Sequence, residues 1–237
     1  MSNGYWGACD LHDERNVRTR SSVLLSYSHN GCEKNIVVDV GPDFRHQCLQ
    51  EGIKKIDSVL MTHAHADHLH GLDDLRPFAF NHGPIPLYGH EDVLRHIEEG
   101  FGYAIRGKNP FINTHAFKVE ESFELFGMEV KAILQKHGDS DSYGFVFPRF
   151  AYTTDLSEFS ASSWNLLNEL DLWVISCNNY TSNEKHAGLD QVLEWISQKN
   201  PKKAVLTHMG CNIDYSEIAK ILPKNVIAAW DGMEMLL

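Results

Sequence analysis

The chain has 237 residues, 43% of them hydrophobic, and a formal net charge of −11 with histidines neutral. This length and composition supply a sizeable core and predict one domain spanning residues 1–237. No run of about 18 apolar residues occurs, so we expect no membrane span. The acidity opposes stable binding of nucleic acid, because a negatively charged protein repels a polyanion.

The N-terminus and the cysteines bear on the cellular compartment. The first residues lack the basic end and the apolar stretch of a signal peptide. The five cysteines are odd in number and widely spaced, which argues against a disulfide framework. We therefore expect a reducing, cytoplasmic location.

Hydrophobic patterns in the first half of the chain predict strands alternating with helices. In chain order, the expected elements are strands at 22–27 and 35–40 with a turn at 29–31, a helix at 44–49 preceded by Asp43, a strand at 58–62, a helix starting at 69, a strand at 86–88 and a helix at 91–99. The segment 100–110 contains three glycines, two aromatic residues and two cations. This composition fits a mobile lid over an anionic ligand, and equally an ordinary long loop or a contact in a homodimer.

The second half of the chain continues the alternation. The expected elements are strands at 114–119 and 128–135, a hairpin at 143–147 and 150–152, a helix at 160–170, a strand at 172–176, a helix at 189–198, a strand at 203–207, a helix at 215–222 and two short strands around 231–232. Two apolar runs, at 59–62 and 205–207, both end in Thr-His. That echo is what a pseudo-twofold αββα sandwich would show.

The stretch from His63 to His68 carries the strongest chemical signal. His63 and His65 are two apart after a buried strand, so in extended chain they point the same way and suit one metal. Asp67 and His68 follow after the chain turns and suit a second metal. Imidazole and carboxylate bind zinc, manganese or iron.

The pattern His63-x-His65-x-Asp67-His68 resembles the signature of the metallo-β-lactamase superfamily. The longer string from Leu60 to Pro77 is similar to the branch that contains the PhnP phosphodiesterases, with the tRNA 3′-processing nucleases nearby. The resemblance implies an α/β fold, the four-layer αββα sandwich of the metallo-β-lactamases. It also implies two divalent metal ions, either zinc or manganese.

The resemblance further implies a ligand set drawn from strand ends along the whole chain. The first metal would be held by His63, His65 and His137, the second by Asp67, His68 and His208, and Asp155 would bridge the two. Two such metals share a water, lower its pKa from 15.7 toward about 7 and so supply a bridging hydroxide.

Other residues have candidate roles beside the metals. Asp39 resembles the strand-end aspartate that orients ligands in the family, and Asp73, Asp74 and Arg76 are candidates to orient the histidines or contact substrate, with a solvated helix end as the alternative. His186 matches the second of two histidines that relatives carry three apart, and Asn183 stands at the first position. His186 is thus our candidate acid for the leaving oxygen, and is catalytic together with Asp67; a surface histidine is the alternative.

Relatives also hold a structural zinc with N-terminal cysteines, of which this chain keeps only Cys9. Cys9 and Cys211 then form either a partial zinc site or two ordinary thiols.

The leading functional hypothesis is a metal-dependent phosphodiesterase for a small cyclic or nucleotide-like phosphate ester. One alternative is a thioester, lactone or β-lactam hydrolase of the same fold. Another is a phosphate-ligand binding protein without activity, which the complete ligand set argues against.

Overall fold

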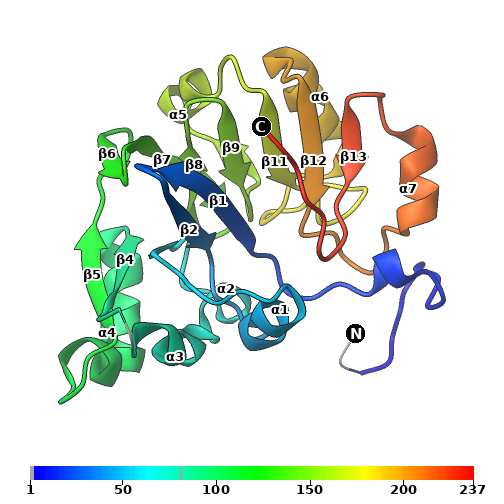
Figure 1. Cartoon of the computed structure of the whole chain (residues 1–237). Helices are drawn as coiled ribbons and strands as arrows, with labels where there is room; N and C mark the ends of the chain where they lie inside the picture. The colour runs from blue at the N-terminus through cyan, green and yellow to red at the C-terminus, as the bar shows by residue number, and fades with distance from the viewer. Residues whose placement is uncertain (1–2, 81) are drawn as a thin grey trace. The chain divides into compact units, whose positions relative to one another are not determined.

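The computed structural model describes residues 3–80 and 82–237. Contacts within the chain define two compact units, and each is described separately (Figure 1). The 19–128 unit is continuous in sequence. The C-terminal unit comprises residues 129–237 together with the segment up to residue 18. The single domain expected for residues 1–237 stays a prediction.

The 19–128 unit contains a sheet with strand order β1-β2-β3-β4-β5. The strands are β1 (Val23–His29), β2 (Cys32–Val38), β3 (Ser58–Leu60), β4 (Ile85–Gly89) and β5 (Ile112–Ala116), with β6 (Ser122–Leu125) following. β1 and β2 form the expected hairpin, in which Asn30 and Gly31 have φ of 52° and 75°. Both positive values fit the tight turns that match the twist of a hairpin. β2 to β5 are parallel, and β3 is fully buried, as parallel strands usually are.

Helical segments connect the parallel strands of this unit. They are α1 (Phe44–Gln50), α2 (Ala66–Leu69), the 3-10 turn η2 (Leu72–Leu75), α3 (Arg76–Ala79) and α4 (Glu91–Arg106). The lid or long loop expected at 100–110 is wrong over most of its length, because α4 continues to Arg106. Val93, Ile97 and Ala104 are buried along one face of α4. Their burial offsets the helix-weakening effect of Gly100 and Gly102, about 1 kcal/mol each.

The C-terminal unit contains a sheet with the path β10-β7-β8-β9-β11-β12-β13. The strands are β7 (Met128–His137), β8 (Ser140–Val146), β9 (Phe150–Thr153), β10 (Glu158–Phe159), β11 (Leu172–Ser176), β12 (Lys203–Thr207) and β13 (Val226–Ala228). Pairing is antiparallel from β10 to β9 and parallel from β9 to β13. The predicted hairpin is confirmed as β8–β9. Of the two strands expected around 231–232, the first corresponds to β13, whereas the second is wrong, since the chain after the turn at 231–232 is irregular.

Helices α5 (Ala161–Leu166), α6 (Leu189–Lys199) and α7 (Tyr215–Ile221) complete this unit, with a 3-10 turn η1 (Glu14–Asn16) near the N-terminus. Figure 1 shows α6 beside β11 and β12. Val192 and Ile196 of α6 join Trp173 of β11 in the buried core. This buried core therefore supports the ends of β11 and β12 and the loops that follow them.

The N-terminal segment is fixed to the C-terminal unit through Asp214. The Asp214 carboxylate accepts hydrogen bonds from the Asp10 amide (2.9 Å), the Asn16 side chain (2.7 Å), the Ser216 hydroxyl (2.7 Å) and the Glu217 amide (3.0 Å). Burial opposes ionisation of this carboxyl group, but these hydrogen bonds outweigh it and hold the pKa of Asp214 well below its ordinary value.

None of the helices in residues 3–80 and 82–237 combines the length and the apolar character needed to cross a bilayer.

Candidate metal-binding residues

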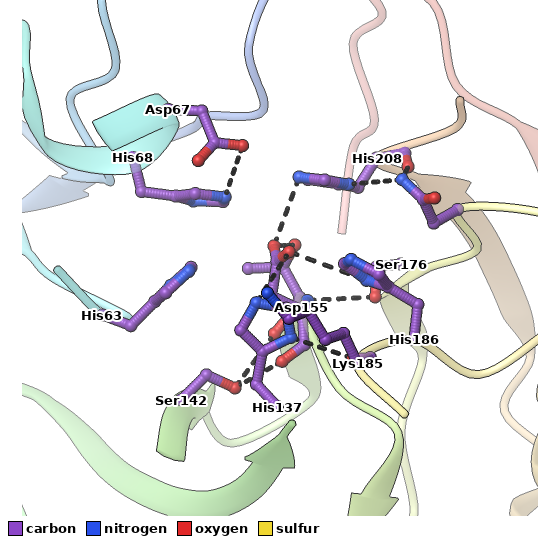
Figure 2. A network of polar contacts seen from close by, with 12 residues as sticks. His63, Asp67, His68, His137, Ser142, Asp155, Ser176, Lys185, His186 and His208 are labelled. Carbon is purple, nitrogen blue, oxygen red and sulfur yellow. Dashed lines mark hydrogen bonds and ion pairs between the residues drawn. The ribbon is translucent and has the colours of Figure 1, made fainter. Parts of the chain in front are cut away.

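In the 19–128 unit, the four predicted ligands lie together after the end of β3. The His63 ring is 4.6 Å from the His65 ring and 4.4 Å from the His68 ring, measured between centroids. Asp67 Oδ2 lies 3.7 Å from His68 Nε2 (Figure 2). His63 and His68 are buried, whereas His65 is exposed and Asp67 is half-buried. The loop between β3 and α2 thus presents three imidazoles and one carboxylate.

Asp39, which directly follows β2, is hydrogen-bonded to this loop. Its Oδ1 accepts a hydrogen bond from the Thr62 amide (2.8 Å), and its Oδ2 accepts one from the Thr62 hydroxyl (2.7 Å). Asp39 Oδ2 also lies 2.7 Å from His68 Nδ1. Because a carboxylate accepts hydrogen bonds, this contact places the proton of His68 on Nδ1 and leaves Nε2 for a metal. The geometry is that of a ligand-orienting residue, the role predicted for Asp39.

Two glycines let the backbone segments around this loop approach closely. A Cβ atom on Gly41 would lie 2.2 Å from the Asp67 carbonyl oxygen, and one on Gly71 would lie 2.0 Å from the Gly41 carbonyl oxygen. The Val40 amide donates to the His68 carbonyl at 2.8 Å, and the Gly71 amide donates to the Val40 carbonyl at 2.9 Å. The position of the ligand loop therefore depends on the absence of side chains at these two sites.

Asp73, Asp74 and Arg76 lie one to two turns further on, in η2 and α3. Asp73 pairs with Arg76 at 3.3 Å, and both side chains are about half exposed. The Arg76 guanidinium lies over the ring of Phe111, 4.8 Å from its centroid. These contacts place Asp73 and Arg76 on the surface of the unit, so their predicted part in orienting ligands or contacting substrate stays a prediction, as does that of Asp74.

In the C-terminal unit, the other predicted ligands surround one carboxylate (Figure 2). His208 Nε2 lies 3.3 Å from Asp155 Oδ2, and His137 Nε2 lies 3.8 Å from Asp155 Oδ1. His186 Nδ1 lies 3.7 Å from the same Oδ1. His137 ends β7, Asp155 follows β9, and His208 follows β12, as the strand-end argument predicted. His186 comes from the loop before α6.

Contacts with the main chain and with neighbouring hydroxyl groups fix these side chains. His137 Nδ1 lies 2.9 Å from the Lys185 carbonyl oxygen, so Nδ1 donates and Nε2 is left toward Asp155. The Thr154 hydroxyl donates to Asp155 Oδ2 at 2.7 Å, and the Asp155 amide donates to the Ser176 hydroxyl at 3.1 Å. None of these partners was predicted. A backbone carbonyl carries no sequence signal, although Thr precedes Asp155 just as it precedes His63 and His208.

Left-handed backbone recurs where these residues leave their strands. Asp39, Asp155 and His208 have φ of 63°, 53° and 54°. Residues other than glycine seldom adopt this conformation, and where they do the strain is commonly found at functional sites.

Asn183 closes the loop that carries His186. Its side-chain oxygen accepts hydrogen bonds from the amides of Lys185 (2.9 Å) and His186 (3.0 Å). The main-chain amide of Asn183 donates to the His186 carbonyl at 2.9 Å. The departure from the usual histidine at position 183 thus supplies a turn-forming side chain rather than a second imidazole.

The donor sets fit divalent cations. His137, Asp155 and His186 each offer a ligand atom within 4.8 Å of the others, and the first two are buried. Imidazole and carboxylate together suit zinc and manganese alike. His186 lies as close to Asp155 as His137 does.

Cys9 and Cys211 do not have the surroundings of a zinc site. The Cys9 thiol donates to the carbonyl oxygens of Cys211 and Ile213, both at 3.2 Å. Burial raises the pKa of this thiol despite the nearby Arg18 guanidinium, which lowers it. Among residues 3–80 and 82–237, no group of three or more metal-binding side chains includes either cysteine. These observations favour ordinary thiols.

Comparison with known proteins identifies the family. A family model described as a β-lactamase superfamily domain matches residues 34–209. The crystal structure of a diphosphatase from the PhnP family superposes with a TM-score of 0.86 and 33% sequence identity, over 94% of this chain and 85% of that one. The chain belongs to the PhnP family of the metallo-β-lactamase superfamily. The predicted α/β class and αββα metallo-β-lactamase fold are thereby confirmed.

Two curated relatives extend the comparison within the superfamily. The chain is 30% identical over 236 residues to an octanoyltransferase of Porphyromonas gingivalis, a match that covers 97% of this chain but only 47% of that protein. It is 29% identical over 226 residues to the anti-Pycsar protein Apyc1 of Paenibacillus harenae, covering 84% of this chain and 90% of that one. The chain therefore spans about half the length of the octanoyltransferase, whose name describes the whole protein.

Proposed function

We propose that this PhnP-family protein is a phosphodiesterase that hydrolyses a small cyclic or nucleotide-like phosphate ester with two divalent metal ions, zinc or manganese. The observation that carries the metal assignment is the buried Asp155 carboxylate with the imidazoles of His137 and His208 beside it. Likeness to a diphosphatase favours phosphorus over carbon as the centre attacked.

The proposed ligand assignment is the one that the family resemblance implies. His63, His65 and His137 would hold one ion, Asp67, His68 and His208 would hold the other, and Asp155 would be their shared ligand. When bound, the ions lower the pKa of a shared water and neutralise the phosphoryl oxygens. Asp39 fixes the ring of His68, and the Lys185 carbonyl fixes that of His137, so both imidazoles present Nε2.

His186 is proposed to give a proton to the leaving alkoxide. Its side chain is 16% exposed, in contrast to the 2% of His137, so a substrate has access to it. Its ring stacks on that of His208 with centroids 5.7 Å apart, which restricts its orientation. A proton delivered to the leaving oxygen avoids the release of a strongly basic alkoxide.

Hydrolysis of bis(p-nitrophenyl) phosphate by protein loaded with zinc or manganese tests this function. We expect release of p-nitrophenolate that stops when a chelator removes the metal. Absence of turnover with either metal, in protein shown to contain two ions per chain, would contradict the proposal.

The second candidate is hydrolysis of an acyl thioester, and the match to an octanoyltransferase favours it. An octanoyl thioester offered in the same assay, with release of the free thiol as the signal, decides between the two. Nucleotide binding without turnover of either substrate would instead indicate a binding protein. A cytoplasmic location, a homodimer and the lack of stable nucleic-acid binding stay predictions.

A further inference from the structure

Within the 19–128 unit, planar side chains gather beside the loop that carries the predicted ligands. The His70 ring lies 6.3 Å from that of Phe101, and Phe101 lies 6.4 Å from Tyr103, measured between centroids. The Arg76 guanidinium lies 5.9 Å from the centroid of the Tyr103 ring. We call His70, Arg76, Phe101 and Tyr103 the α4 aromatic surface. Figure 1 shows its two main elements, α3 and α4, next to each other.

These side chains remain accessible although a buried core lies nearby. His70 is exposed, Phe101 is half-buried and Tyr103 is 47% exposed, whereas Phe111 beneath Tyr103 is buried. The Tyr103 hydroxyl is hydrogen-bonded to Asp73, which in turn pairs with Arg76. The rings are therefore held in place by neighbours without being covered by them within the unit.

The backbone of α4 departs from helical geometry at the centre of this surface. Phe101 has φ of −128° and ψ of 28° inside a helix that continues on both sides. Gly100 and Gly102 flank it, and the space where a Cβ on Gly100 would lie is open. The irregularity thus lies at the residue whose ring contacts His70.

The surface is adjacent to a predicted metal ligand. His70 directly follows α2 as its C-cap, and its amide donates to the Ala66 carbonyl at 3.0 Å. Asp67 lies three positions earlier, a spacing at which side chains on a helical turn are neighbours. We infer that the rings of His70 and Phe101 are within reach of the organic substituent of a phosphate ester held by the cation proposed at Asp67.

We propose that the α4 aromatic surface binds the base of a nucleotide-like phosphate ester by stacking. The inference rests on the proposed function, since it supplies the substrate class for that site. Rings and a guanidinium stack on the π-face of any base, with little dependence on its identity. An acyl chain has no flat face to match this set, so the surface favours a nucleotide over a lipid-like ester.

Equilibrium binding to zinc-loaded protein tests the proposal independently of turnover. Adenosine monophosphate and inorganic phosphate are the two probes, titrated by calorimetry into wild type and into Phe101→Leu, which keeps apolar volume but removes the ring. We expect the Kd for adenosine monophosphate to rise about 10-fold in Phe101→Leu, from the usual contribution of base stacking, with the Kd for phosphate unchanged. Phe80→Leu is the matched control, because Phe80 is 74% exposed in the same unit and lies outside the α4 aromatic surface.

The outcomes separate this inference from the proposed function. A Kd for adenosine monophosphate that is the same in wild type and Phe101→Leu, both folded by circular dichroism, overturns the stacking surface even if the protein hydrolyses bis(p-nitrophenyl) phosphate. Equal affinity of wild type for the two probes also overturns it. Phe101-dependent binding in a protein that hydrolyses no phosphodiester supports the surface and removes the phosphodiesterase assignment.

Discussion

Replacing Asp39 by asparagine tests how the metal ligands are held in place. The change keeps the shape of the side chain but puts an amide group where one carboxylate oxygen was. Asp39 Oδ2 is the oxygen that faces both His68 Nδ1 and the Thr62 hydroxyl at 2.7 Å. Whichever way the amide is turned, at least one of the Thr62 amide, the Thr62 hydroxyl and His68 Nδ1 loses its acceptor in a fully buried position.

The size of the effect follows from that loss. Mutation of groups that orient metal-binding histidines typically lowers metal affinity by about 10- to 100-fold. This range corresponds to about 1.4–2.8 kcal/mol, which agrees with the value of a hydrogen bond to a charged group. We therefore expect the zinc Kd of Asp39→Asn, measured by competition with a chelating dye, to rise by about 10- to 100-fold.

A matched control and a clear refutation are available. Asp43→Asn makes the same chemical change four residues later, where the carboxylate accepts a hydrogen bond from the Arg20 amide that an asparagine oxygen can also accept. Its zinc affinity should equal that of wild type. If Asp39→Asn is folded and binds zinc as tightly as wild type, the reasoning that Asp39 fixes the His68 ring is wrong.

Three further predictions concern the ligand loop, the proposed acid and the N-terminal segment. Gly71→Ala should destabilise the fold and weaken zinc binding, because its Cβ would lie 2.0 Å from the Gly41 carbonyl oxygen; an unchanged melting temperature would contradict this. His186→Ala should lower turnover by about 10²-fold or more with two metals still bound per chain, whereas loss of one metal would show that His186 is a ligand. The depressed pKa of Asp214 stabilises the fold above the ordinary value of 3.8, and this contribution is lost as the pH falls through the lower folded value. Asp214→Asn should therefore be less stable than wild type at neutral pH and show a smaller loss of stability in acid, measured by urea unfolding at several pH values.

Sequence alone predicted the parts of the fold that apolar runs and strand ends determine. The runs that became β3 and β12 both end where histidines begin, and a strand buried on both faces leaves polar residues only at its ends. The same logic correctly predicted strand-end positions for His137 and Asp155. The candidate ligands lie at the ends of buried strands, so the same sequence pattern predicts both the strand and the position of the ligand.

The remaining features were hidden for physical reasons. The extension of α4 was missed because Gly100, Gly102 and Gly107 suggest a loop. In the structure, Ile97 and Ala104 are seven residues apart and buried, and their packing stabilises the helical chain on both sides of Phe101. The support of His137 by the Lys185 carbonyl was missed because every residue offers the same backbone carbonyl group. Such contacts depend on how loops close, which local patterns do not determine.

The left-handed backbone at Asp39, Asp155 and His208 has a cost in folding free energy at residues in or beside the proposed metal site. Glycine adopts such φ values without penalty, whereas other residues at strained positions cost on the order of 1–3 kcal/mol each. At Asp155 and His208 the cost falls on residues that we propose to hold a cation, and at Asp39 it falls on the residue that orients the His68 ring. Under the proposed function, selection for stability would favour relief of this strain at position 155, whereas selection for activity would keep the carboxylate there.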